Sequence, residues 1–133
     1  GADVTARMEE SPEAYMGMSA VDCPNLFITP GPNGVLGHAG NGVFFAECHV
    51  RYIVESLRAL FEQGASTMTV TEEALETYLE ELCAELPNYV QSQPGLENWY
   101  RGDRDRVTTI APKTVIEFWN DCRQPDLDAY TFS

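Results

Sequence analysis

Residues 25–64 read NLFITPGPNGVLGHAGNGVFFAECHVRYIVESLRALFEQG. The short apolar run at 25–29 predicts a buried strand that ends in a sharp loop at Pro30. Five glycines and two prolines between residues 30 and 42 exclude regular structure there and let backbone approach another group closely. Apolar residues then recur at helical spacing, and Gly64 follows them, so the sequence predicts a helix over 43–63. Its N-terminus could receive an anionic or polar ligand edge.

A second amphipathic helix is predicted after Thr71, because two glutamates follow this N-cap and an apolar stripe continues until Pro87. Ser11, Pro12 and Glu13 together predict the start of a short helix that Gly17 soon interrupts.

The remaining segments have weaker patterns. Residues 106–110 are interpreted as a strand, residues 114–123 as a short helix, and residues 124–133 as a tail without apolar periodicity. The predicted fold class is α+β and mainly helical, with two long amphipathic helices and a few short strands in a single domain over 1–133.

Composition narrows the class of partner. The formal net charge of −13 repels phosphate backbones and anionic lipid surfaces, so we expect no nucleic acid and no membrane partner. Residues 1–10 lack the layout of a signal peptide, and we therefore expect a cytoplasmic protein. The glutamates of residues 71–85 are interpreted as a solvated helix face.

The four cysteines, Cys23, Cys48, Cys83 and Cys122, are far apart and form no C-x-x-C pair. We interpret them as free thiols, and the sequence supports no metal site. It also holds neither a G-x-G-x-x-G nor a G-x-x-x-x-G-K-[ST] phosphate-binding motif. For the chain alone we therefore expect no nucleotide cofactor.

Several short strings together resemble the C-terminal part of Baeyer–Villiger-type flavin-containing monooxygenases. The resemblance covers residues 12–130 and is carried by PEAYMGM at 12–18, PNLF at 24–27, GPN at 31–33, LGH at 36–38, Glu47, RYI at 51–53, NWY at 98–100, RVT at 106–108, PKTV at 112–115, FW at 118–119 and RQPD at 123–126. The family's FAD-binding and NADP-binding glycine fingerprints, and its linking F-x-G-x-x-x-H motif, are absent from this sequence.

The resemblance implies a remnant of a flavin monooxygenase. By position, Gly31, Pro32 and Asn33 would be flavin neighbours if the chain were assembled with an FAD domain, and FAD and NADPH would then be the cofactors. Cys48 and His49 stand where the family more often has Ala-Gln, which places an acid-base candidate at the edge of the long helix's apolar face.

Two accounts follow: an excised piece of a larger monooxygenase, or a stand-alone protein descended from one. We favour the second, because a cut through an FAD domain would leave one strand with unpaired edges. The stand-alone protein would bind a small apolar metabolite, perform a cofactor-free cyclisation, isomerisation or pericyclic rearrangement, and pair with a second copy as a homodimer. A non-catalytic module that binds a metabolite or a partner protein is the competing hypothesis.

The candidate catalytic residues of such an enzyme are the titratable side chains His38, His49 and Glu47. The candidate wall or donor residues are Asn33, Tyr52, Trp99 and Tyr100. Each also has a structural interpretation. His38 can hydrogen-bond backbone, His49 can be satisfied by packing, Glu47 can pair with Arg51, and the two aromatic residues can be core or interface anchors.

Overall fold

The structure is a computed structural model that describes residues 4–10, 12–37, 41–96, 98–101 and 106–133. Its elements are α1 (Val4–Glu10), β1 (Val35–Leu36), α2 (Gly42–Glu62), β2 (Met68–Val70), α3 (Glu72–Glu85), β3 (Ile110–Ala111), α4 (Val115–Asp121) and β4 (Tyr130–Phe132). Short 3₁₀ turns lie at Leu86–Asn88, Val90–Ser92 and Leu127–Ala129. The mixed, mainly helical class is confirmed. In the described part of the chain, no helix combines the length and apolar character of a membrane span.

Helix α2 occupies the region where the sequence predicts a helix. The side-chain oxygen of Asn41 accepts hydrogen bonds from the backbone N–H groups of Val43 and Phe44, which caps the N-terminus. At the other end Gly64 has a φ of +65°, the left-handed conformation that commonly terminates a helix. The N-terminal N–H groups are thus partly satisfied within the chain, which reduces their capacity for an outside ligand.

Two further helices also follow local capping signals. The Thr71 side chain accepts a hydrogen bond from the backbone of Ala74 and starts α3. Thr114 and Glu117 form a reciprocal capping box at the start of α4. The predicted short helix at 114–123 is therefore confirmed, with α4 at Val115–Asp121.

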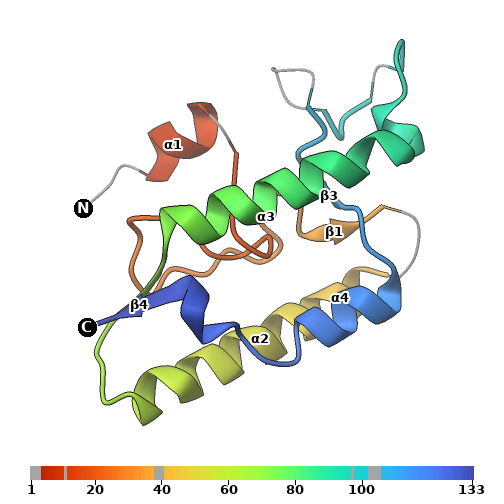
Figure 1. Ribbon diagram of the computed structural model, residues 1–133. Coiled ribbons are helices and arrows are strands. Elements are labelled where there is room, and N and C mark those ends of the chain that lie inside the picture. Colours follow the sequence, from red (N-terminus) through yellow and green to blue (C-terminus); the bar gives the residue numbers. More distant parts are fainter. Residues whose placement is uncertain (1–3, 11, 38–40, 97, 102–105) are drawn as a thin grey trace.

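The core lies between α2 and α3, and the loop segment of residues 12–36 fills much of the space between the two helices (Figure 1). Helix α4 packs beside the N-terminal half of α2, where Trp119 meets Phe44 with ring centroids 6.3 Å apart and Arg51 lies 4.9 Å from the Trp119 centroid. Core side chains therefore come from helices and loops alike. They include Met18, Tyr52, Leu75, Ile110 and Phe118.

The predicted tail at 124–133 is wrong. Strand β4 pairs antiparallel with β2, so that Met68 lies opposite Phe132 and Val70 opposite Tyr130. Tyr130 is buried, and its hydroxyl lies 3.0 Å from both Ser19 Oγ and Tyr52 Oη. A strand of three residues is too short to show an apolar period, which is why the sequence pattern missed it.

The helix predicted to start at Ser11 is also wrong. Helix α1 ends at Glu10, and residues 12–14 are not helical. Met16 and Gly17 both have positive φ, and a bridge joins Tyr15 to Ser19, so this segment makes a tight hairpin turn instead. Gly17 has a physical role here, since few other residues adopt such a conformation without strain.

Two strand predictions need correction. In the segment 25–29 only Phe27 forms a bridge, to Ser19, because Asn25 has a φ of +60° and its side chain bonds to the Met68 N–H and the Ser66 carbonyl. The glycine-rich loop holds a regular element after all, since β1 pairs in parallel with β3. In the segment 106–110 only Ile110 belongs to that strand, and Val107 bridges to Arg101.

All four cysteines are free thiols. Cys23, Cys48 and Cys122 are buried, whereas Cys83 is exposed on α3. Burial is the main reason that the pKa of Cys122 is raised to about 12, with smaller contributions from Cys48 and Asp121. The Cys122 thiol therefore stays protonated and unreactive.

The position of β4 generates a first prediction. Replacing Tyr130 by phenylalanine leaves the buried hydroxyls of Ser19 and Tyr52 without their shared partner. We expect the free energy of unfolding to fall by about 1–3 kcal/mol in urea titrations. The control Thr131→Ser changes an exposed residue of the same strand and should stay within about 0.5 kcal/mol of the parent. Equal losses in both variants would show that β4 is not anchored by Tyr130.

Candidate functional site

Three glycines lie where the glycine-rich loop packs against the hairpin turn: Gly31 and Gly34 belong to the loop, and Gly17 belongs to the turn. The Gly31 N–H donates to the Gly17 carbonyl at 2.9 Å, and a Cβ added at Gly31 would lie 2.6 Å from that oxygen. A Cβ added at Gly17 would lie 2.5 Å from the Cα of Gly34. These contacts are shorter than side chains tolerate, so the glycines are needed for packing of the loop against the hairpin turn.

Asn33 fastens this loop to the segment 107–110. Its side-chain amide donates to the carbonyls of Val107 at 3.1 Å and Ile110 at 2.7 Å, while its backbone N–H donates to Thr108 at 2.7 Å. Asn33 is buried and has a φ of +53°, a conformation that asparagine adopts more readily than most residues. Its Oδ1 atom is buried and has no hydrogen-bond partner. One polar atom of the loop therefore remains available to another group.

His49 lies on the inner face of α2 and is fully buried. Its Nδ1 is 3.0 Å from the Thr29 hydroxyl, and its ring packs against Phe118 at a centroid distance of 5.5 Å. The Nε2 atom is buried without a partner. Burial lowers the pKa of His49 to about 4, so the imidazole is neutral at physiological pH. It is also close to the loop, since a Cβ at Gly34 would lie 3.0 Å from His49 Cε1.

The other predicted site residues lie elsewhere. Glu47 is exposed on α2 while His49 is buried, so the two do not act on one reactant from the same side. The guanidinium of its proposed partner Arg51 lies over Trp119. His38 lies outside the described residues. The two described members of the predicted catalytic set, Glu47 and His49, therefore do not form a common site.

The predicted wall residues also separate. Tyr52 is buried, and its hydroxyl is bonded to that of Tyr130. Trp99 is exposed and stacks on Tyr100 with centroids 4.1 Å apart. Of the catalytic and wall candidates that the structure describes, only Asn33 and His49 come together at the loop. Sequence reasoning missed Gly17, Thr29 and Tyr130, because each of them acts through a contact that is distant in the chain.

The geometry supports no metal centre in the part of the chain that the structure describes, since no group of three or more His, Cys, Asp or Glu side chains could hold an ion there. The site is instead a tightly packed loop with two unsatisfied buried polar atoms, Asn33 Oδ1 and His49 Nε2.

Comparison with solved structures identifies the fold. The chain superposes on a steroid monooxygenase bound to NADP with a TM-score of 0.79 and 21% identity, over 95% of this chain and 24% of that one. It superposes on cyclohexanone monooxygenase from Rhodococcus sp. Phi1 bound to NADP⁺ with a TM-score of 0.70 and 18% identity, over 92% and 23%. The fold is therefore that of a segment of these monooxygenases.

Sequence comparison identifies the relatives more closely. The chain is 31% identical to a Baeyer–Villiger monooxygenase of Pseudomonas aeruginosa over 131 residues, 98% of this chain and 25% of that protein. It is 29% identical to an uncharacterized monooxygenase of Sinorhizobium fredii over 118 residues, 89% and 18%. An FAD-binding monooxygenase of Aspergillus niger is 28% identical over 120 residues, 87% and 20%. No family model matches.

The homologues of this chain are thus Baeyer–Villiger and FAD-binding monooxygenases, which confirms the resemblance stated from the sequence. The chain spans only between 18% and 25% of the length of these three relatives.

The packing of the loop generates a second prediction. In Gly31→Ala the new methyl group meets the Gly17 backbone, and we expect a loss of about 1–3 kcal/mol in the free energy of unfolding. Gly42→Ala is the matched control, because its Cβ would meet only Phe45 Cζ, at an ordinary 3.9 Å. Urea unfolding of both variants measures the difference. If both lose the same stability, the close approach of Gly31 to Gly17 is not required.

The buried imidazole generates a third prediction. Because the folded pKa of His49 lies near 4 and the unfolded value near 6.5, the unfolded chain takes up a proton first. The stability present above pH 6.5 is therefore lost as the pH falls toward 4. Between pH 7.5 and 4.5 we expect the parent to lose about 2–3 kcal/mol more than His49→Asn, which cannot titrate.

Urea unfolding at the two pH values measures both losses. The carboxylates titrate in parent and variant alike, so the comparison isolates the imidazole. Parallel losses in the two proteins would mean that His49 is protonated in the fold.

Proposed function

We propose that this chain is the C-terminal part of an FAD- and NADPH-dependent Baeyer–Villiger monooxygenase and forms one wall of its flavin chamber. The observation that carries the proposal is the 31% identity to a Baeyer–Villiger monooxygenase over nearly the whole chain. These findings favour the excised-piece account over the cofactor-free cyclisation or isomerisation, for which they give no support. The dispersed positions of Glu47, His49 and Tyr52 also favour it.

An exposed apolar stripe on α2 supports the proposal. Five apolar side chains on this helix are between 37% and 76% exposed: Val43, Val50, Val54, Leu57 and Phe61. Their spacing of three, four or seven residues places them on one face of the helix. A shallow groove of about 520 Å³, lined by Val43 and Val50 among others, lies at its N-terminal end. A continuous apolar face of this length indicates a surface that another part of a larger protein covers.

The loop fits one side of a flavin but not a whole dinucleotide site. Gly31 and Pro32 are only half-buried, and Asn33 Oδ1 has no partner in the chain, so these residues would form a wall with one hydrogen-bond acceptor. The phosphates would need a glycine-rich turn from elsewhere in the longer protein. FAD reduced by NADPH would supply the oxygen chemistry of a monooxygenase.

The chain's own residues would give that wall its shape and exclude water from it. Asn33 holds the segment 107–110 against the loop through three hydrogen bonds. His49, neutral and packed between Thr29 and Phe118, fills the space behind Gly34 without introducing a charge. A site that excludes water in this way strengthens the electrostatic interactions inside it.

A chimera tests the proposal. The 133 residues replace the matching segment of the Pseudomonas aeruginosa enzyme, and bound FAD and ketone-dependent NADPH oxidation are measured. We expect the chimera to retain FAD and to oxidise NADPH, and the isolated chain to bind no FAD. A folded chimera without FAD, or tight stoichiometric FAD on the isolated chain, would contradict the proposal.

The stripe is tested in the same chimera. Val54→Asp places a charge in the centre of the apolar face and should abolish FAD retention, because an unpaired charge cannot be buried at an interface without a large penalty. Ile116→Asp is the matched control, since Ile116 is also a β-branched apolar residue, is even more exposed than Val54, and lies on α4 outside the stripe. It should leave FAD content unchanged. Similar effects of the two variants would show that the α2 stripe is not the covered surface.

A further inference from the structure

The exposed apolar stripe on α2 has the spacing of a coiled-coil seam. Glu47 lies between the first two apolar members of the stripe, and with it the positions alternate strictly by four and three residues along the helix. We call these positions the α2 seam, and all of them are exposed: Val43, Glu47, Val50, Val54, Leu57 and Phe61. This alternation is that of the a and d positions of a heptad repeat, which form a narrow stripe covered by a facing helix.

The width of the seam indicates the shape of its partner. Arg51 and Arg58 border the seam on one side, and the Arg58 side chain is 61% exposed. On the other side Ile53 and Leu60 turn into the core of the chain. The uncovered apolar surface is therefore only one seam wide. A single helix fits such a surface, whereas a sheet buries a whole apolar face against its partner.

Glu47 is the one charged residue of the seam. It lines the shallow groove of about 520 Å³ together with Val43 and Val50. Arg51, four residues further along, does not neutralise it. The Arg51 guanidinium lies 4.9 Å from the Trp119 ring centroid, and the described residues form no Glu47–Arg51 ion pair. A partner that covers the groove buries this carboxylate, and an unpaired buried charge is costly, so the partner must present a cation opposite Glu47.

A second copy of the chain does not meet this requirement. Parallel pairing of two α2 seams would place Glu47 against Glu47, and antiparallel pairing would place it against Leu57. The Arg58 guanidinium beside Leu57 is already paired with Glu55, at 2.9 Å. Two copies would also repel each other, because each carries a formal net charge of −13. The seam therefore fits a different helix.

A longer protein has the length to supply that helix. The chain spans only between 18% and 25% of three of its relatives, so most of each relative lies outside the matched segment. We propose that α2 packs along a helix from the remaining part of a longer monooxygenase, and that a lysine or arginine of this helix pairs with Glu47. The proposal rests on the proposed function and names the partner of the covered surface. A single polar pair in an apolar seam would also fix the register of the two helices.

Synthetic peptides test the proposal on the 133-residue chain. Each peptide has the length of α2 and leucine at its seam positions, except that the second or the fifth is lysine, to suit parallel or antiparallel packing. Matched peptides carry glutamate in place of the lysine. Fluorescence anisotropy is measured at concentrations where the peptide alone is monomeric by sedimentation. We expect saturable one-to-one binding, and one lysine peptide should bind about five-fold more tightly than its glutamate counterpart.

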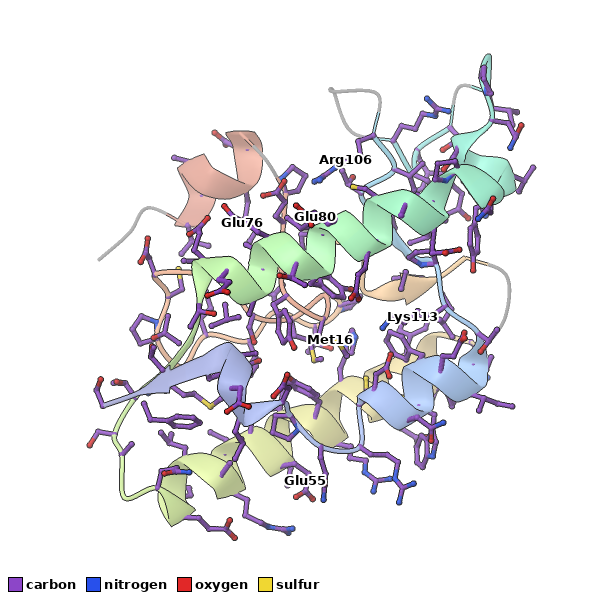
Figure 2. The ribbon with its side chains drawn as sticks, in the orientation of Figure 1. Met16, Glu55, Glu76, Glu80, Arg106 and Lys113 are labelled. Atoms are coloured by element: carbon purple, nitrogen blue, oxygen red, sulfur yellow. The ribbon has the colours of Figure 1, made fainter. Side chains whose placement is uncertain are left out.

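Charge variants of the chain identify the residue responsible. Glu47→Lys should reverse the preference, so that the glutamate peptide binds about five-fold more tightly. Glu80→Lys is the matched control, because it makes the same change in net charge on α3, where Figure 2 shows Glu80 across the core from Glu55 of α2. It should leave the preference within about two-fold of the parent. Glu47→Gln should remove the preference, and it decides the outcome if Glu47→Lys fails to fold by circular dichroism.

Three results would overturn the proposal. The first is the absence of saturable binding by any of the peptides, and the second is a lysine preference that survives in the Glu47 variants. The third is sedimentation of the chain alone as a dimer that Val54→Asp dissociates, because a second copy would then cover the seam. The chimera decides the proposed function separately. FAD retention in the chimera together with a failed peptide titration would therefore remove only the partner helix.

Discussion

The side chain of Asn33 joins parts of the chain that are 74 and 77 residues apart, and much of the structure depends on this contact. Its amide binds the carbonyls of Val107 and Ile110, and the pairing of β1 with β3 follows immediately after it. Helix α2 begins a few residues later, at Gly42. The two-residue strands alone could not hold this arrangement.

The parts of the fold that could be predicted are those with local signals. Helix α2 shows a long apolar period and a terminal glycine, α3 starts at Thr71, and α4 starts at the Thr114 capping box. The strands could not be predicted reliably, because elements of two or three residues contain too few positions for an alternating pattern. Strand β4 is the clearest case, since its position depends on the burial of Tyr130 against Ser19 and Tyr52.

The candidate site shows the same division. The sequence places Asn33 in the glycine-rich loop and His49 at the edge of the long helix's apolar face, and the structure brings both to that loop. Glu47 and His49 are near neighbours in sequence, but two residues along a helix turn the side chain to a different face. The sequence predicts that the acidic segment of α3 is a solvated face. It also forms a wall of a cleft, because the last residues of the chain fold back opposite it instead of forming a tail.

The distribution of the thiols has a practical consequence. Of the four cysteines, only Cys83 is exposed, and it lies near Leu86, Arg101 and Arg106 on the outer side of α3. A maleimide fluorophore added to the folded chain would therefore attach at this single position without any engineering. Its emission would report directly on whether Arg101 and Arg106 remain close to the helix.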